Sequence, residues 1–537
     1  MYKLIIALLF LYVYIFGDNI VLGGEQCISY TDSKSGLTEN CGTAAATPCQ
    51  SISQSILSCG GQFESITMNI EPGTYLINQA TFGKVTNQSI TLVNNNKETN
   101  DVIIDLSNAT DSFIRIEPSS IYDTSIVSFT GITFQNGNKP YGPVLFNNGT
   151  SNIQLEINNC VFNNNNATIG GGSIAIDSTD GESDYPPANS VINISKTTFN
   201  NSTSSKISGG VLYAFDLNVV ITIDQCSFSN IRNSASGGII YMRNGLLTMT
   251  NSKLDSIASN AAFFLASEFL TTPQFKFTNV NFTNALGGIG FAFTNYFTKT
   301  YFLNCNFVNN LNTAPIFGLN SGLITVDSCL FANNNNQKSP GSSGGAISLT
   351  ATECLVKNSI FTNNFAQNGG AININSSNYA FLDTPTTIIG SQFINNTAAV
   401  SGGAIDIYSS SITINSTSFI GNYAKQDDHG PSVYCTNSKI NLSSTTFKIN
   451  ETNTVNSFGI DCLPSVSYFC TVINQSKKLQ CEKDDFEISS DNTNGLTTGQ
   501  KVGISFGVIG GFFLIVIVAV LVVRKVKRDR QYKPIGL

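Results

Sequence analysis

Acidic side chains beside the single histidine form the best constellation for chemistry in the sequence. Asp427, Asp428 and His429 are consecutive, and Asp406 precedes them by little more than twenty residues. Two facing carboxylates can hydrolyse a glycosidic bond, and a carboxylate beside an imidazole can bind a metal ion or move a proton. The same residue types also form solvated turns, and Gly430-Pro431 follows at once. The turn is the preferred interpretation, so these four residues are weak catalytic candidates.

A second acidic group lies in a stretch that ends in two prolines. It consists of Asp177, Asp180, Glu182 and Asp184. Carboxylate oxygens are the ligands that calcium prefers, although acidic surface loops are common. These residues are therefore weak calcium candidates. Zinc is not expected, because the chain has one His and no Cys-x-x-Cys pair. No cofactor is predicted.

A recurrent phenylalanine reveals the elements that must position these groups. The mean spacing of its twelve positions, (447 − 134)/11, is about 28 residues. Apolar residues recur seven and five positions before each anchor, and a small residue usually stands two before it. This pattern predicts two short strands that meet at a bend with polar residues facing outward. The anchors are Phe134, Phe162, Phe199, Phe228, Leu254, Phe282, Phe307, Phe331, Phe361, Phe393, Phe419 and Phe447.

Paired glycines mark a further strand in each repeat. Glycine permits the positive φ of a tight turn, and alternating apolar residues follow each pair. One repeat cannot bury its apolar side alone, whereas stacked repeats bury a continuous core. The sequence therefore predicts a parallel β-helix, about 60 Å long for twelve coils of about 4.8 Å each. The pairs begin at Gly171, Gly209, Gly237, Gly344, Gly369 and Gly402.

The repeat resembles that of the polymorphic outer membrane proteins. Gly-Gly-Ala-Ile alternates with Phe-x-x-Asn, as at Phe331, Phe361 and Phe393. The resemblance implies an all-β, right-handed, pectin lyase-like β-helix used in adhesion at a cell surface. It covers roughly 130–450 and does not extend to that family's outer-membrane barrel. Pectin lyase-like proteins also include polysaccharide lyases and glycosidases, but the Asp-Asp and Gly-His-Gly signatures of polygalacturonases are not reproduced as a set.

A short helix is expected before the repeats. Ile52, Ile56 and Leu57 have helical spacing between Pro48 and Ser58. A helix over the open end of the solenoid would cover exposed strand edges. This segment resembles the capping helix of pectin lyase-like proteins.

The thirteen cysteines divide by environment. Two even sets at the ends are expected to form two disulfides each, with the pairing left open. Five central cysteines point into the predicted core, where buried thiols are the preferred interpretation. Of these, only Cys305 and Cys329, on adjacent coils, could bond. The end sets are Cys27, Cys41, Cys49, Cys59 and Cys435, Cys462, Cys470, Cys481, and the central set is Cys160, Cys226, Cys305, Cys329 and Cys354.

Two apolar segments predict a single-pass type I protein of the plasma membrane. Lys3 precedes the apolar run from Leu4 to Phe16, which is typical of a signal peptide removed between Gly17 and Gly24. The uncharged stretch 502–523 is long enough to span a membrane, and six basic residues follow it. The expected order is signal peptide (1–23), N-terminal cap and first coils (24–125), repeats (126–460), C-terminal cap and stalk (461–501), span (502–523) and cytosolic tail (524–537).

Two short motifs suggest partners for the ends of the chain. Gly503, Gly507 and Gly511 recur on one face of the span and would allow two copies to approach closely. Tyr532 and Ile535 resemble the tyrosine-x-x-apolar sorting signal that clathrin adaptors read. The net charge of −7 offers no basic surface for nucleic acid.

Asparagine is abundant, with 64 residues, and creates many glycosylation sequons. The predicted signal peptide would expose them to the glycosylation machinery. Together these features predict a noncatalytic cell-surface glycoprotein for adhesion or recognition, with glycans among the candidate ligands. The alternative is a membrane-tethered carbohydrate-active enzyme. The sequons begin at Asn87, Asn108, Asn148, Asn166, Asn193, Asn200, Asn201, Asn281, Asn375, Asn395, Asn415, Asn441, Asn450 and Asn474.

Overall fold

A computed structural model describes the solenoid-forming part of the chain, and the chain divides into the compact units Met1–Glu482 and Lys483–Leu537. The predicted signal peptide, span and tail lie outside the described residues. Within the described part, no helix is long and apolar enough to cross a membrane. The described residues are 26–480 except 60–63, 79–81, 86–87, 97–99, 118–122, 149–151, 178–188, 207–208, 216–217, 234–235, 243–244, 266–273, 296–297, 313, 320–321, 337–342, 376–385, 426–429, 449–458, 463–469 and 475–476.

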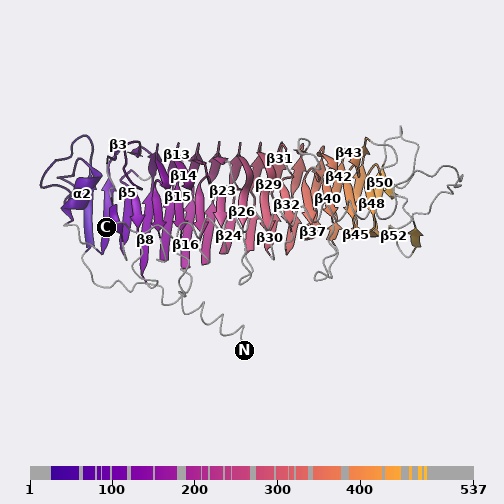
Figure 1. Ribbon diagram of the computed structural model, residues 1–537. Coiled ribbons are helices and arrows are strands. Elements are labelled where there is room, and N and C mark those ends of the chain that lie inside the picture. Colours follow the sequence, from indigo (N-terminus) through magenta and orange to yellow (C-terminus); the bar gives the residue numbers. More distant parts are fainter. Residues whose placement is uncertain are drawn as a thin grey trace, which may run out of the picture. The chain divides into compact units, whose positions relative to one another are not determined.

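The described strands stack into a parallel β-solenoid (Figure 1). Three long sheets run along it, which we call sheet A (17 strands), sheet B (14 strands) and sheet C (18 strands). The pairings between coils are parallel, and β52 (Thr471–Asn474) with β53 (Lys477–Gln480) forms an antiparallel hairpin. The predicted parallel solenoid is confirmed.

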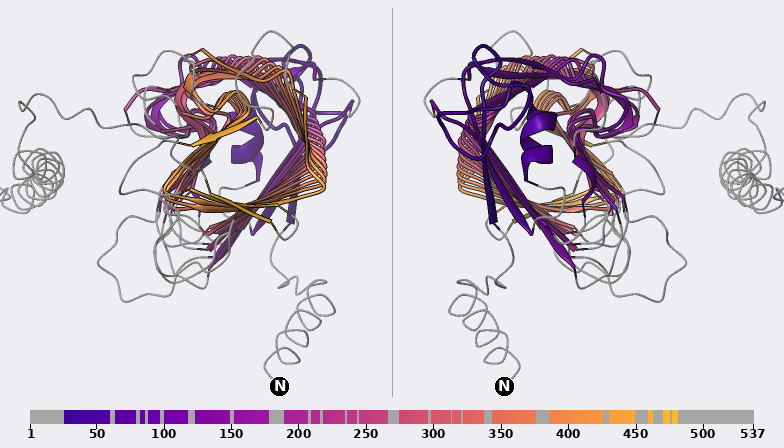
Figure 2. Two further views of the ribbon diagram at one scale, coloured as in Figure 1. Left: turned by 90° about the vertical axis from the view of Figure 1, so that its right-hand side faces the viewer. Right: turned by 90° about the vertical axis from the view of Figure 1, so that its left-hand side faces the viewer.

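One coil illustrates the path of the chain. β16 (Asn189–Ser195) lies in sheet A and β17 (Thr198–Asn200) in sheet B. β18 (Thr203–Ser204) and β19 (Leu212–Phe215) follow in sheet C, and β20 (Asn218–Asp224) starts the next coil beside β16. The end views show successive coils superposed around a common axis (Figure 2). Each sheet therefore places equivalent residues of successive coils side by side.

Sheet B carries the recurrent phenylalanine. All twelve anchors are in register, from β9 (Ile132–Gln135) to β50 (Thr446–Lys448). Stacked rings of neighbouring anchors lie 4.5 to 5.3 Å apart between centroids, and Leu254 stands between Phe228 and Phe282. Two earlier strands, β3 (Gly73–Leu76) and β6 (Val102–Asp105), extend the sheet toward the N-terminus.

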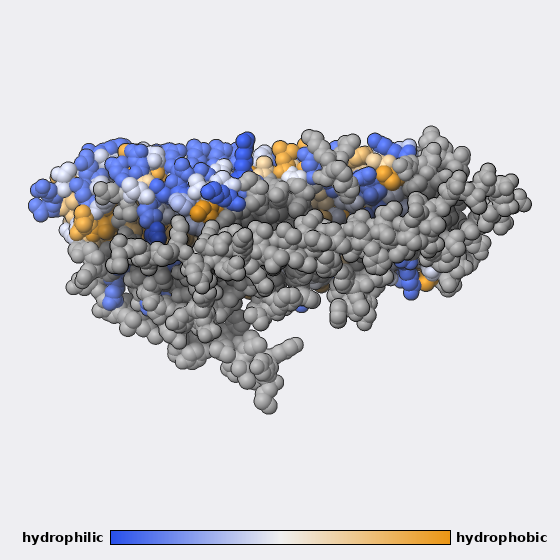
Figure 3. Space-filling view, viewed as in Figure 1, coloured by the Kyte–Doolittle hydropathy of each residue, from blue (hydrophilic) through white to orange (hydrophobic). Residues whose placement is uncertain are grey.

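The outer surface differs along the edge of the solenoid that is uppermost in Figure 3. Its N-terminal half is mostly hydrophilic, and apolar residues gather near β31 (Asn306–Val308).

Residues with positive φ make the corners on both sides of the anchors from Phe134 to Phe419, and the corner before Phe447. Three residues before Phe361, Asn358 has φ 47°, and two residues after it, Asn363 has φ 54°. Asn accepts this left-handed conformation more readily than most residues, because its short side chain can hydrogen-bond locally. The predicted bend before the anchor is confirmed, and the second corner explains the Asn after it.

A ladder of buried asparagines lines the second corner. Asn334 donates from its backbone N and its Nδ2 to Oδ1 of Asn364, at 3.1 and 2.8 Å. Asn364 makes the same pair of bonds to Asn396, at 3.0 and 2.9 Å. Each member also donates Nδ2 to an anchor's carbonyl, as Asn364 does to Phe331 O at 3.0 Å. The ladder, which also includes Asn310 and Asn422, satisfies backbone groups that a bend would otherwise leave buried and unpaired.

The paired glycines serve two different purposes. Gly369, the first of its pair, has φ 61°, as the predicted turn requires. Gly370 has ordinary φ, but a Cβ there would lie 2.1 Å from the carbonyl oxygen of Gly403 in the next coil. The second glycine is therefore required by close contact between coils, and only the first was predicted from turn geometry.

Helix α2 (Ile52–Ser58) closes the N-terminal end, where Figure 2 shows it crossing the opening. It begins at Ile52 rather than Pro48, because Ser51 and Gln54 form a capping box. Ile52 is buried, but Leu57 is 73% exposed, so its expected place on the apolar face is wrong. A helix of two turns presents only one narrow face to the solenoid.

Disulfides secure both ends. Cys27–Cys59 joins β1 (Gln26–Thr31) to the end of the helix, and Cys41–Cys49 closes the loop between them. Cys435–Cys470 links two coils at the other end. The fourth expected pair involves Cys481, which lies outside the described residues.

Candidate functional site

The outward face of sheet C carries a second, smaller apolar cluster. In these strands alternate residues point into the core, and the residues between them point outward. Phe146 of β11 (Leu145–Asn148), Ala175 of β15 (Ile174–Asp177) and Tyr213 of β19 are register partners on successive coils. Tyr241 of β23 (Ser236–Met242) is the next partner. We call Phe146, Tyr213, Tyr241 and the adjoining Tyr141 the aromatic cluster.

Two stacked ring pairs form the aromatic cluster. Tyr141, in β10 (Asn138–Tyr141), lies over Phe146 with 5.0 Å between centroids and 8° between planes. Tyr213 and Tyr241 stack at 5.5 Å. Phe146 and Tyr213 are only 7% and 4% exposed, whereas Tyr141 and Tyr241 are half-buried and keep ring surface open to solvent. Burial and the negative charge of Asp177 raise the pKa of the Tyr141 hydroxyl.

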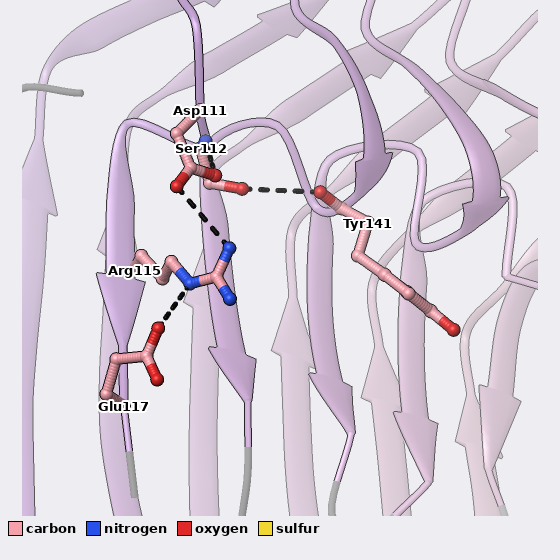
Figure 4. A network of polar contacts seen from close by, with 5 residues as sticks. All are labelled: Asp111, Ser112, Arg115, Glu117 and Tyr141. Atoms are coloured by element: carbon pink, nitrogen blue, oxygen red, sulfur yellow. Dashed lines mark hydrogen bonds and ion pairs between the residues drawn. The ribbon is translucent and has the colours of Figure 1, made fainter. Parts of the chain in front are cut away.

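Charged groups flank the aromatic cluster on its N-terminal side (Figure 4). Arg115 lies in β7 (Ile114–Ile116), with its Cζ 5.4 Å from the centroid of the Phe146 ring. Its Nε donates to Oε1 of Glu117 at 2.6 Å, and its Nη1 lies 3.4 Å from Oδ2 of Asp111. These ion pairs fix the plane of a part-exposed guanidinium beside the rings. The arrangement combines flat apolar surface with oriented hydrogen-bonding groups.

The predicted acidic loop contributes one residue to this region. Asp177 ends β15 and is buried, in register with Asn148 and Phe215. Asp180, Glu182 and Asp184 lie outside the described residues. Among the residues that the structure describes, no group of three or more His, Cys, Asp or Glu is placed to hold a metal ion. The calcium hypothesis therefore gains no support from the described part of the chain.

Asp406 lies on the same outward face, far from Asp177. It is buried in β44 (Ile405–Tyr408) and accepts a hydrogen bond from Ser401 Oγ at 2.8 Å. Eight strand pairings separate β15 from β44, which corresponds to about 38 Å. Carboxylates that cleave a glycosidic bond stand at most about 9.5 Å apart. These two aspartates therefore cannot act on one bond.

The remaining catalytic candidates fall between two strands of one coil. Asp427, Asp428 and His429 lie outside the described residues, between β47 (Tyr423–Ala424) and β48 (Val433–Thr436). Gly430, which follows them, has φ 63°, the value of the first glycine in the other repeats. Gly430 therefore belongs to the recurrent turn of the coil.

The aromatic cluster was missed in the sequence, although part of it has a signal there. Tyr213 and Tyr241 each follow a Gly-Gly pair by three residues, directly after the first inward residue of the strand. The sequence pattern was interpreted only through the inward residues of these strands. The outward tyrosine between two inward residues was therefore not recognised. Arg115 and Tyr141 belong to no repeated motif, and only the stacking of coils brings them together.

The five central cysteines are free, buried thiols, as expected. Burial raises the pKa of Cys160 and Cys354 to about 12 each and that of Cys226 to about 11. The backbone N of Cys305 donates to Sγ of Cys329 at 3.3 Å, so these two contact each other as stacked, small side chains. The contact with Cys329 lowers the pKa of Cys305, but all five thiols are buried and lack the exposure that a nucleophile at the surface requires.

The sequon asparagines are segregated from the buried ones. The structure describes the side chains of eleven of the fourteen, all except Asn87, Asn450 and Asn474, and none of the eleven is buried. No buried asparagine of the ladder belongs to a sequon. A glycan at any of the eleven would therefore leave the core intact.

Comparison with known proteins identifies no relative at the level of sequence. No family model matches the chain, and no curated protein matches it. Solved structures include the catalytic domain of a GH87 alpha-1,3-glucanase in complex with nigerose, at 11% identity and a TM-score of 0.27, with 80% of this chain and 68% of that chain covered. A variant of a GH87 alpha-1,3-glucanase domain in complex with tetrasaccharides has 11% identity and a TM-score of 0.23, with 80% and 67% covered. At these values the likeness adds nothing to the parallel β-solenoid that the strand pairings already show.

Proposed function

We propose that this protein is a cell-surface glycoprotein whose β-solenoid recognises glycans without cleaving them. One observation carries the proposal: the aromatic cluster lies beside the ion-paired Arg115 on the outward face of sheet C. A sugar ring offers one apolar face of C–H groups and an equator of hydroxyls. Half-buried tyrosine rings can pack on the apolar C–H face. An oriented guanidinium and its carboxylates can hydrogen-bond to the hydroxyls.

The disulfides and the outward sequons support export of the chain. Disulfides persist in oxidising compartments, and the structure contains three of them. Display on the plasma membrane through the span 502–523 completes the proposal, and the close-packing glycines around Gly507 would allow two spans to associate. In the tail, Tyr532 and Ile535 would bind a clathrin adaptor, so Tyr532→Ala should slow uptake of surface-labelled protein.

A carbohydrate-active enzyme is the second candidate function, and one specific alignment favours it. Asn148 is the register partner of Asp177, and continuing the β7–β11 register by one residue places Glu117 on the other side of Asn148. The backbones that carry Glu117 and Asp177 are thus two pairings apart, about 10 Å. This backbone separation leaves room for the two carboxyl groups to stand about 6.5–9.5 Å apart, as in an inverting glycosidase.

Binding and cleavage can be measured on the same preparation. The full-length protein in detergent is screened on a glycan array, and bound glycans are then incubated with it and assayed for released reducing ends. Binding without release supports recognition, and release that is lost in Glu117→Gln and Asp177→Asn supports the enzyme.

Variants of the aromatic cluster locate the binding site. Tyr241→Ala should weaken binding at least tenfold, whereas Tyr301→Ala, a tyrosine on the outward face of sheet A, should not. Absence of binding to any glycan, or equal loss in both variants, would contradict the proposal.

A further inference from the structure

A glycosylation sequon adjoins the aromatic cluster. Asn148 ends β11, is followed by Gly149 and Thr150, and stands two residues after Phe146. Alternate residues of a strand share one face, so Asn148 projects from the outward face of sheet C, about 6.6 Å along the strand from Phe146. Its side chain is part-exposed. A glycan attached to Asn148 would therefore begin beside the rings.

This placement distinguishes Asn148 from the other sequons. Phenylalanine also stands two residues before Asn201 and Asn395, but both of those rings are inward anchors of sheet B and are fully buried. Phe146 lies outside the solenoid core, in the separate aromatic cluster. At Asn148 the ring and the asparagine therefore share one outward face.

Tyr141 extends from the rings toward the sequon. Its ring stacks on Phe146, and burial together with the negative charge of Asp177 raises the pKa of its hydroxyl. Asp177 is the register partner of Asn148. Figure 4 shows the Tyr141 side chain extending from its backbone toward the level of Glu117. The ring therefore reaches toward the row of outward residues that contains Asn148.

We propose that the protein's own N-linked glycan at Asn148 lies on the aromatic cluster and competes there with the glycans of other molecules. The inference rests on the proposed function, because it assigns an attached ligand to the same rings. The C–H face of the first N-acetylglucosamine packs on Tyr141, and the following sugars lie along the outward face toward Tyr241. Three strand pairings separate Asn148 from the strand of Tyr241, about 14 Å.

Covalent attachment makes this competition effective. A ligand on a short, flexible linker has an effective concentration in the mM range. If its dissociation constant on the rings is about tenfold below that concentration, the rings are occupied in roughly nine molecules of ten, and the apparent affinity for a free glycan falls about tenfold. Glycosylation of Asn148 thereby regulates the aromatic cluster.

Enzymatic release of glycans from the folded, full-length protein tests where the Asn148 glycan lies. Glycopeptide mass spectrometry of protein made in eukaryotic cells should first find Asn148 occupied. A peptide-N-glycosidase should then release this glycan about tenfold more slowly than the glycan at Asn193, because packing on the rings shields it. Asn193 is the matched control, since it projects from the outward face of sheet A between Glu156 and Thr222.

Variants show whether the rings cause this protection. Tyr141→Ala should bring the release rates at Asn148 and Asn193 together, whereas Tyr301→Ala on sheet A should leave them apart. Reduced, heat-denatured protein should release both glycans at the same rate. Circular dichroism verifies that both variants remain folded.

Binding of a free glycan tests the competition. Asn148→Gln and Thr150→Ala both remove the sequon, and Thr150→Ala keeps the asparagine. Each should raise the affinity for a glycan found on the array about tenfold, whereas Asn193→Gln should leave it unchanged.

Three results would overturn the inference: an unoccupied Asn148, a slow release that Tyr141→Ala leaves unchanged, or equal affinity for free glycan with and without the sequon. Failure of every variant to bind any free glycan would instead contradict the proposed function. The release rates are measured without added ligand, so they would still decide whether the attached glycan lies on the rings.

Discussion

At the scale of single residues, burial controls the chemistry of the thiols and tyrosines. Tyr75 shows the effect clearly, because burial raises its pKa to about 12 while its hydroxyl donates to Glu71 O at 2.8 Å. Burial likewise raises the pKa of the central cysteines Cys160, Cys226 and Cys354. Their sulfur atoms act as small apolar side chains of the core, and their reactivity is suppressed.

Thiol labelling tests this suppression. Only the thiolate reacts, and pKa values of about 11 to 12 for Cys160, Cys226 and Cys354 leave about one thiol in a thousand or fewer ionised at pH 8. We expect no labelling of the native protein at pH 8 by a maleimide, and labelling of all five central cysteines in 6 M guanidinium. Rapid labelling of any of them in the native state, measured by mass spectrometry, would contradict their inward placement.

Outward carboxylates make stability depend on pH. Hydrogen bonds from Thr250 and Asn251 hold the pKa of Asp224 below its ordinary value of 3.8. Because this pKa is lowered in the folded state, the stabilisation is present above about pH 4 and is lost as the pH falls through the folded pKa. Thr250→Val should therefore reduce the free energy of unfolding at pH 6 more than at pH 2.5. Urea denaturation at both values measures the difference, and an equal loss at both would refute the assignment.

At the scale of the elements, the two corners decide whether a coil can close. Asn363 supplies left-handed backbone, and Asn364 satisfies buried donors on the coil before it. The two residues are adjacent and chemically identical, yet their contributions differ in kind. Substituting each asparagine by alanine in turn separates their contributions to stability.

Asn364→Ala should be far more destabilising than Asn363→Ala. The first change leaves two donors of Asn334 and the carbonyl of Phe331 without their buried partner, at about 1–3 kcal/mol for each of the three groups, so at least about 3 kcal/mol in all. The second adds the left-handed strain of an alanine, about 1–2 kcal/mol, and removes an exposed hydrogen bond from Asn363 Nδ2 to Asn333 Oδ1. Thermal and urea unfolding of both variants measure the difference. Similar losses in both would show that the ladder contributes little.

At the scale of the whole molecule, the solenoid must be closed at its ends, because the end coils lack a neighbour on one side. Helix α2 and two disulfides close the N-terminal end, and Cys435–Cys470 with the β52–β53 hairpin closes the other.

Peptide mapping without reduction tests the closure at the C-terminal end. Because Cys435 pairs with Cys470, we expect the remaining two cysteines of the set, Cys462 and Cys481, to be linked. Cys435→Ala should lower the free energy of unfolding by about 2–4 kcal/mol, the usual effect of losing a disulfide. Cys462 is the register partner of Cys435. A Cys435–Cys462 linkage, or free Cys462 and Cys481 in the secreted protein, would refute this pairing.

The sequence alone determined the repeat, its inward anchors and the bend before them. These features depend on strand alternation and on a fixed repeat length, which spacing reveals directly: Phe361 and Cys354 are buried where the periodicity placed them. Only the tertiary structure decided the disulfide partners, the close contact at Gly370 and the aromatic cluster. Contacts across coils depend on register and on the number of strands between residues. That is why Asp177 and Asp406 share a face yet stand about 38 Å apart, while Arg115 and Phe146, 31 residues apart in sequence, are neighbours.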